Sequence, residues 1–221
     1  MKKKFNKIYA LYGASGASAG ILPFAKDLCK GSEIFYIDDD VSKKYYLDTK
    51  VLSFKEFLNI NANKKFVALT IGSPKTRKKL SKILKINNIL DWSINPKNFI
   101  KLQNVKIGKG YVINNYVTIT SNITIGSYFK AGIYSYVEHD CILGDYVTLS
   151  PGAKCNGNVI IKDEVFVGSG AIILNGTPKN PLVIGKCSII GAGAVVTKSV
   201  SPYSIIVGNP GRKIGATNNR F

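Results

Sequence analysis

The chain of 221 residues is poor in histidine, in acidic residues and in long apolar runs. Its single histidine, His139, means that one chain cannot supply the three imidazoles that bind zinc in many enzymes. No apolar run approaches the ~20 residues that span a bilayer, so no membrane insertion is expected. The apolar segment at residues 8–12 is shorter than the ~7 residues of a signal-peptide core. We therefore expect a cytoplasmic protein.

Cysteine is also scarce, and the cysteines form no C-x-x-C pair. The four are Cys29, Cys141, Cys155 and Cys187. Because zinc sites usually take thiolates at close spacing, we predict no metal site and four reduced, buried thiols. Reduced thiols agree with a reducing compartment.

Acidic residues are outnumbered, with 13 Asp+Glu against 31 Lys+Arg and a net charge of +18. This excess indicates polyanionic partners, either nucleic acid or ligands that carry several phosphates. It fits equally well a bias of composition toward solvated lysines. The lysines are scattered rather than grouped with aromatic residues, which argues against a dedicated nucleic-acid surface.

Residues 1–95 alternate between short apolar runs and helical patterns, as in a Rossmann-like α/β domain. We predict strands at residues 7–12, 33–38 and 66–72. The sequence GASGASAG follows the first strand, and a helix is expected to follow it. Residues 74–85 predict a second helix, with proline in its first turn.

Residues 96–221 have a different period, because an aliphatic or small residue recurs every six positions. The series runs through Ile107, Ile113, Ile119, Ile125, Ala131, Val137, Leu143, Leu149, Cys155, Ile161, Val167 and Ile173, and resumes after five extra residues at Ile184, Ile190 and Val196. A period of six is typical of a parallel β-helix with three short strands per coil, whose recurring residues point inward. The interruption at residues 174–183 contains Asn, Gly and two Pro and predicts an external loop.

Several segments together resemble a known family. They are IYALYGASG, IDDD, TIGSPKTRKKL, VEHDCILGDYVTLSPGAKCNGNV, IIGAGAVVTKSV and VGNPGRKI, in this order along the chain. The sequence resembles the left-handed β-helix sugar acyltransferases. It is most similar to the bacterial nucleotide 4-amino-sugar N-acetyltransferases of the bacillosamine pathway type, and next to the sialic-acid O-acetyltransferases. This resemblance implies a left-handed coil and acetyl transfer from acetyl-CoA.

His139 lies between two carboxylates in VEHDC. Acetyl transfer to an amine or a hydroxyl needs a base, and imidazole has a suitable pKa of ~6.5. The hexapeptide register points Val137 inward, which places His139 near a turn on the surface of the coil. The resemblance implies that His139 is the general base, that Asp140 modulates it, and that Glu138 contacts the acceptor. The alternative is a surface histidine with acidic neighbours.

The resemblance also implies two substrate sites. For acetyl-CoA the matched positions are Thr148, Gly157, Ser169 and Ala192, and Arg212 and Lys213 are candidates to meet its phosphates. For the nucleotide sugar, UDP- or dTDP-linked, they are Ser15, Gly16, Ala17, Asp38, Asp39 and Gly72. Plainer interpretations remain open: the glycines can be coil corners, the aspartates a solvated turn, and Arg77 either helix surface or ligand.

Three positions depart from the family pattern. Ala17 and Thr148 stand where relatives often carry histidine, and Gly132 stands where they often carry asparagine. All three lie near the acceptor or the thioester in the family arrangement. They therefore bear on the identity of the substrate rather than on the reaction.

Four hypotheses follow. The first is an N-acetyltransferase acting on a nucleotide-linked 4-amino-4,6-dideoxy sugar, and the second is a sugar O-acetyltransferase of the sialic-acid type. The third is a non-catalytic trimeric scaffold or binding module, and the fourth a nucleic-acid-binding protein. From the packing of the coil we expect a homotrimer. Its interfaces would bury the aromatic side chains of Tyr134, Tyr136, Tyr146 and Phe166.

Overall fold

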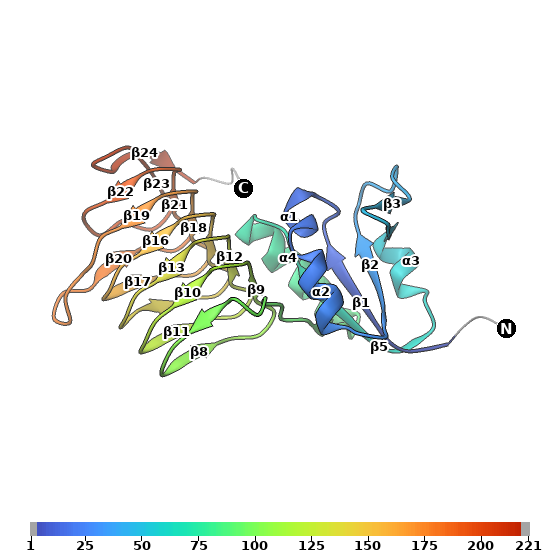
Figure 1. The fold of residues 1–221 in the computed structure, drawn as a ribbon. Helices are drawn as coiled ribbons and strands as arrows, with labels where there is room; N and C mark the ends of the chain where they lie inside the picture. The colour runs from blue at the N-terminus through green and yellow to red at the C-terminus, as the bar shows by residue number, and fades with distance from the viewer. Residues whose placement is uncertain (1–3, 218–221) are drawn as a thin grey trace.

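The computed structural model describes residues 4–217 and consists of an α/β layer followed by a β-helix (Figure 1). The first sheet has the order β3-β4-β2-β1-β5-β6 and is parallel except for the β3–β4 hairpin. Its strands are β1 (Phe5–Tyr12), β2 (Glu33–Ile37), β3 (Tyr45–Tyr46), β4 (Thr49–Leu52), β5 (Ala62–Leu69) and β6 (Leu90–Asp91). The helices are α1 (Gly16–Ala19), α2 (Leu22–Leu28), α3 (Phe54–Leu58) and α4 (Pro74–Ile86).

The three predicted strands and the helix at residues 74–85 are confirmed, although β5 begins four residues earlier and ends at Leu69. α4 starts where expected because the Ser73 hydroxyl accepts the Thr76 amide and Pro74 occupies the first turn. The strands β3, β4 and β6 are too short to give a clear pattern. The helix α3 was missed, although Ser53 and Glu56 form a capping box at its start.

The β-helix has three faces, each a parallel sheet of very short strands. The first face contains β7 (Ile100–Lys101), β10 (Thr118–Ile119), β13 (Tyr136–Val137), β16 (Lys154–Cys155), β19 (Ile172–Ile173) and β22 (Val195–Val196). The second contains β8 (Val105–Ile107), β11 (Ile123–Ile125), β14 (Ile142–Leu143), β17 (Val159–Ile161) and β20 (Leu182–Ile184). The third contains β9 (Val112–Ile113), β12 (Lys130–Ala131), β15 (Thr148–Leu149), β18 (Phe166–Val167), β21 (Ile189–Ile190), β23 (Ser204–Val207) and the antiparallel β24 (Arg212–Ala216).

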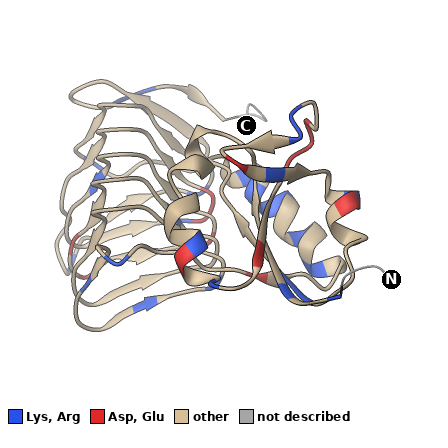
Figure 2. Ribbon diagram, turned by 45° about the vertical axis from the view of Figure 1, so that its right-hand side comes forward, with Lys and Arg blue, Asp and Glu red and all other residues tan. Residues whose placement is uncertain are grey.

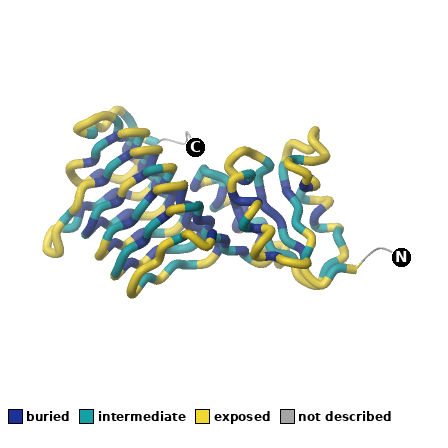
Figure 3. The backbone as a smooth tube through the Cα atoms, in the orientation of Figure 1, coloured by how far each residue is buried: buried dark blue, intermediate teal, exposed yellow. Residues whose placement is uncertain are grey.

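The hexapeptide prediction is confirmed by the stacking of the coils. Ile119, Val137, Cys155 and Ile173 pair in register on successive coils, and each is fully buried. Figure 3 shows the buried residues as a continuous column along the coil interior. The loop between β19 and β20, at residues 174–181, projects from the coil (Figure 1). Burial of this apolar column is the main stabilising contribution to the fold.

At the corners of the coil the chain turns through left-handed backbone conformations. One corner, between the first and second faces, has Asn104, Asn122, Asp140 and Asn158 at φ of 54–60°. These residues are 18 positions apart, which is one coil. Asn and Asp tolerate this conformation because their short polar side chains can form local hydrogen bonds.

Three interpretations of single side chains were wrong. Arg77 is neither helix surface nor an exposed ligand, since it is 1% exposed. Tyr146 is not free to line an interface between copies: its ring stacks on Tyr128 at 5.0 Å, and its hydroxyl lies 2.9 Å from the Ser81 hydroxyl of α4. Cys187 is only partly buried, whereas Cys29, Cys141 and Cys155 are buried as predicted.

Lysine and arginine residues are spread over both halves of the chain (Figure 2). Within residues 4–217, no helix has the length and apolar character needed to cross a membrane.

The Arg77 guanidinium joins the two halves of the protein at the corner between the second and third faces. Its acceptors, at 2.7–3.3 Å, are the carbonyl oxygens of Ile71, Gly72, Tyr128, Tyr146 and Val147. The first two follow β5, and the other three belong to turns of the coil. A salt bridge between Lys78 and Glu164 lies beside it.

We expect Arg77→Met to lower the free energy of unfolding by about 3 kcal/mol, because it leaves buried carbonyl groups without donors. Lys79→Met, an exposed change on the same helix, is the matched control and should have little effect. Urea denaturation of both variants measures the difference. Equal midpoints would contradict the role assigned to Arg77.

Candidate active site

His139 lies on the corner between the first and second faces, directly after β13. Its inward neighbour Val137 is fully buried, whereas the His139 side chain is 54% exposed, as the register predicted. The Nδ1 atom lies 2.7 Å from Asp140 Oδ2. Asp140 accepts this contact from a left-handed backbone conformation at φ 58°, which turns its carboxylate back along the corner toward the ring.

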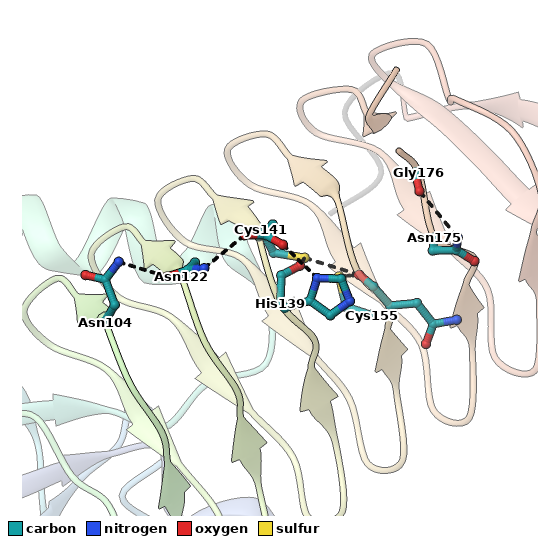
Figure 4. Close-up of polar contacts among 9 residues, drawn as sticks. Asn104, Asn122, His139, Cys141, Cys155, Asn175 and Gly176 are labelled. Carbon is teal, nitrogen blue, oxygen red and sulfur yellow. Dashed lines mark hydrogen bonds and ion pairs between the residues drawn. The ribbon is translucent and has the colours of Figure 1, made fainter. Parts of the chain in front are cut away.

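A row of amide side chains supports Asp140. Asn122 Nδ2 donates to Asp140 Oδ1 at 3.2 Å, and Asn104 Nδ2 donates to Asn122 Oδ1 at 2.9 Å. Figure 4 shows this row leading along the corner to the imidazole ring. The two asparagines were not among the predicted site residues. Their spacing of 18 before Asp140 is the sequence signal that could have revealed them, since it equals one coil.

The hydrogen bonds of His139 and Asp140 shift the pKa of each group. The contact with Asp140 is the main reason that the pKa of His139 is raised above 6.5, and it lowers the pKa of Asp140, to which Asn122 also contributes. A carboxylate acceptor at Nδ1 favours the tautomer with its proton on Nδ1 and leaves Nε2 free to accept a proton. This is the arrangement of a general base with an orienting carboxylate.

Gly157 packs against the His139 ring. A Cβ atom at this position would lie 2.6 Å from both Cε1 and Nε2 of His139, which lies on the preceding coil. The backbone amide of Asn158 also donates to the His139 carbonyl at 3.0 Å. The absence of a side chain at Gly157 therefore makes room for the imidazole ring.

The predicted nucleotide residues gather at the carboxyl ends of β1, β2 and β5. Ser15, Gly16 and Ala17 are exposed, and Asp39 is exposed beside the hydroxyl of Tyr12 at 3.2 Å. Asp38 is less available, because its two oxygens accept the amides of Ala14 at 2.6 Å and Asp40 at 3.0 Å. Asp38 thus ties the glycine-rich loop to the end of β2.

Thr148 and Gly72 meet where the N-terminal sheet contacts the third face. The Thr148 hydroxyl donates to the Gly72 carbonyl at 2.9 Å, and Thr148 is 2% exposed. A cavity of about 420 Å³ opens beside Gly72. Its lining includes Ser73, Lys75, Glu164, Phe166, Cys187, Ile189, Tyr203 and Thr217.

Known proteins resemble this chain over nearly its whole length. The PglD N-terminal domain family matches residues 9–84. GDP-perosamine N-acetyltransferase of Escherichia coli O157:H7 is 40% identical over 212 residues, which cover 94% of this chain and 96% of that protein. The chain belongs to the hexapeptide-repeat sugar acetyltransferases.

Solved structures agree with this sugar acetyltransferase fold. WeeI from Acinetobacter baumannii AYE is 41% identical, with a TM-score of 0.92 over 95% of this chain and all of that one. PerB from Caulobacter crescentus, solved with CoA and GDP-perosamine, is 22% identical, with a TM-score of 0.80 over 94% of this chain and 97% of that one. The second likeness supports the fold alone.

In this acetyltransferase the predicted site residues fall into separate groups. His139, Asp140, Glu138 and Gly157 share one corner, and Ser169 and Ala192 are exposed on another, between the third and first faces. Thr148 and Gly72 form a third group at the contact between the two halves. The fourth group, at the carboxyl end of the N-terminal sheet, contains Ser15, Gly16, Ala17, Asp38 and Asp39. Among the described residues, the hydrogen bonds of Arg77 join the N-terminal half to the corner with Tyr128 and Tyr146.

The three departures from the family pattern have different structural settings. Ala17 is exposed in the glycine-rich loop, and Thr148 is held by Gly72. At Gly132 a Cβ atom would lie 2.5 Å from the Pro151 nitrogen, so no side chain fits between these coils. Residues 4–217 contain no group of three or more His, Cys, Asp or Glu side chains placed to bind a metal ion.

We expect Asp140→Asn to lower the pKa of His139, because a neutral amide stabilises the imidazolium less than a carboxylate does. As His139 is the only histidine, its ring signals in an NMR titration are assigned without ambiguity. Asp27→Asn, an exposed change on α2, is the control and should leave the titration unchanged. A pKa that stays the same in Asp140→Asn would contradict the pairing.

Proposed function

We propose that this acetyltransferase transfers the acetyl group of acetyl-CoA to the amine of a nucleotide-linked 4-amino-4,6-dideoxy sugar. The observation that carries the proposal is the hydrogen-bonded His139–Asp140 pair on the coil corner of a chain with a full-length relative named as a GDP-perosamine N-acetyltransferase. Acetyl-CoA and the sugar are substrates, and no metal is invoked.

In the proposed mechanism the sugar amine attacks the thioester carbonyl, so that a C–N bond forms and the C–S bond breaks. His139 Nε2 accepts the proton that the amine loses. Asp140 holds the opposite ring nitrogen and stabilises the imidazolium that develops. The same proton then passes to the departing thiolate of CoA, which returns His139 to its neutral form. Asn122 acts through Asp140, by holding the carboxylate in place.

The identity of the nucleotide belongs to this proposal. UDP and dTDP were expected from the sequence, whereas the relative at 40% identity is named for a GDP sugar. GDP-perosamine is therefore the first substrate to test. Asp39 is the better of the two aspartates to contact the nucleoside, since both oxygens of Asp38 already accept backbone amides.

A homotrimer is also part of the proposal. His139 and the nucleotide residues lie on different sides of one chain, so a complete site requires a second copy. In a threefold ring, the His139 corner of one copy would face the third face of its neighbour, where Thr148, Gly72 and the cavity lie. Acetyl-CoA would then lie between copies, with Gly157, Ser169 and Ala192 contributed from the corners of the coil.

The first test mixes purified protein with acetyl-CoA and GDP-, UDP- and dTDP-linked 4-amino sugars and follows the release of free thiol. Turnover with at least one amine is expected. Turnover only with hydroxyl sugars would favour O-acetylation instead. Turnover with neither class, together with steeply salt-dependent binding to random DNA, would favour a nucleic-acid-binding protein.

We expect His139→Asn to lower kcat by about 10²–10⁴-fold, the usual contribution of a general base. In the wild-type protein, kcat should rise with pH through the pKa of His139, which lies above 6.5, because only neutral imidazole accepts the proton. The binding of acetyl-CoA to the variant serves as the control and should persist. An unchanged kcat would exclude His139 as the base.

The shared site predicts complementation between two inactive variants. We expect His139→Ala and Asp39→Arg to be inactive alone. Co-expressed with different tags and purified through both, a mixed threefold ring always has one productive interface and recovers about one third of wild-type activity. Light scattering should give three times 24.1 kDa. No recovery, with that mass confirmed, would mean that each chain forms its own site.

A further inference from the structure

Lys130 is a buried cation where the two halves of the chain meet. It lies in β12 on the third face, between Val112 and Thr148 in the strand register, and its side chain points away from the coil interior. It is 8% exposed. Its ammonium group donates to the carbonyl oxygen of Thr70, the residue that follows β5. The β-helix thus extends a positive charge to the carboxyl end of the N-terminal sheet.

Among residues 4–217 this charge has no acidic partner. The ion pairs among residues 4–217 are Lys78–Glu164, Lys109–Asp91 and His139–Asp140, and none includes Lys130. The charged group that faces it from α4 is another cation, Arg77, and its neighbours on the third face carry no charge. Burial and then repulsion by Arg77 lower the pKa of Lys130 to about 7.

The two buried cations are not equivalent. Arg77 donates to five carbonyl oxygens and is fully occupied. Lys130 has three N–H donors and one carbonyl acceptor among the described residues. A buried ammonium that lacks both a carboxylate and a full set of acceptors is costly in an empty protein, and an anionic ligand would relieve that cost.

The location of Lys130 suits such a ligand. Thr70 is bonded to the end of β1, since its hydroxyl donates to the Tyr12 carbonyl at 2.6 Å. The glycine-rich loop begins at Gly13, directly after Tyr12. Gly13 has φ 105° and lies against Thr70 and Ile71. In parallel α/β sheets, ligands bind in the crevice outside the carboxyl ends of the strands where the order reverses, here between β1 and β5.

We propose that Lys130 binds the diphosphate of the nucleotide sugar, opposite the glycine-rich loop, so that the phosphate site is made by both halves of one chain. The identity of the ligand rests on the proposed function, whereas the site itself rests on the buried charge. A bound dianion raises the pKa of the ammonium. Binding is therefore accompanied by uptake of a proton above pH 7, where the empty protein has lost it.

The experiment uses calorimetric titration with GDP-mannose, UDP-glucose and dTDP-glucose, whose diphosphates carry no group that titrates near neutral pH. With the probe that binds most tightly, we expect Lys130→Met to weaken binding by about 10–100-fold. Lys106→Met, an exposed change in β8, is the matched control and should leave binding unchanged. The affinity for acetyl-CoA should be the same in all three proteins.

Proton uptake is measured on the same titrations in buffers of different ionisation enthalpy. We expect about one proton to be taken up at pH 8 and almost none at pH 6, where Lys130 is already charged. The uptake should persist in His139→Asn, which removes the imidazole as a source of it. This measurement on the wild-type protein holds even if Lys130→Met fails to fold.

Equal affinities in Lys130→Met and the wild type, the absence of proton uptake at pH 8, or no binding of any of the three probes would each overturn the proposal. These outcomes are separate from those of the acetyl-transfer assay. Probes that bind through Lys130 without any acetyl transfer would refute the proposed function alone. Acetyl transfer with unchanged binding in Lys130→Met would refute the role of Lys130 alone.

Discussion

The arrangement of the protein depends on the guanidinium of Arg77. Each coil turn exposes carbonyl groups at its corner, and the loop after β5 exposes two more. One planar cation satisfies both sets. Because the donors of arginine are fixed in direction, the contact determines orientation as well as proximity. It places the end of β5 over the third face, where Thr148 and Lys130 reach the carbonyls of Gly72 and Thr70.

The same contact leaves the His139 corner uncovered by the chain's own N-terminal half. The N-terminal half packs against the corner with Tyr128 and Tyr146 and against the third face. His139 lies on another corner of the coil, between the first and second faces, and its side chain is 54% exposed. The separation is a consequence of coil geometry, since residues a few positions apart along the chain lie on different faces.

Repetition of the coil also builds the hydrogen-bonded row that holds Asp140 beside His139. A residue and its counterpart 18 positions away lie one above the other, so Asn104, Asn122 and Asp140 form a hydrogen-bonded row without any long loop. The carboxylate at the end of the row orients the imidazole ring, and Gly157, one coil further on, leaves space for it. Substitutions at this corner are therefore expected to affect the His139 ring through the packing of successive coils as well as through charge.

The sequence by itself determined the β-helix, because its period of six is a direct consequence of three short strands per coil. The inward position of Val137 and the exposure of His139 followed from that register. The glycine-rich loop and the capped helix α4 were also predictable, since their signals are local.

Only the tertiary structure decided what happens to Arg77, Lys130 and Tyr146. The local sequence around each of them is compatible with either an exposed or a buried side chain. The partner that buries each one lies 50 to 70 residues away along the chain. Local sequence cannot report such contacts. Two of the positive charges counted in the composition, on Arg77 and Lys130, are therefore buried between the halves of the protein rather than solvated.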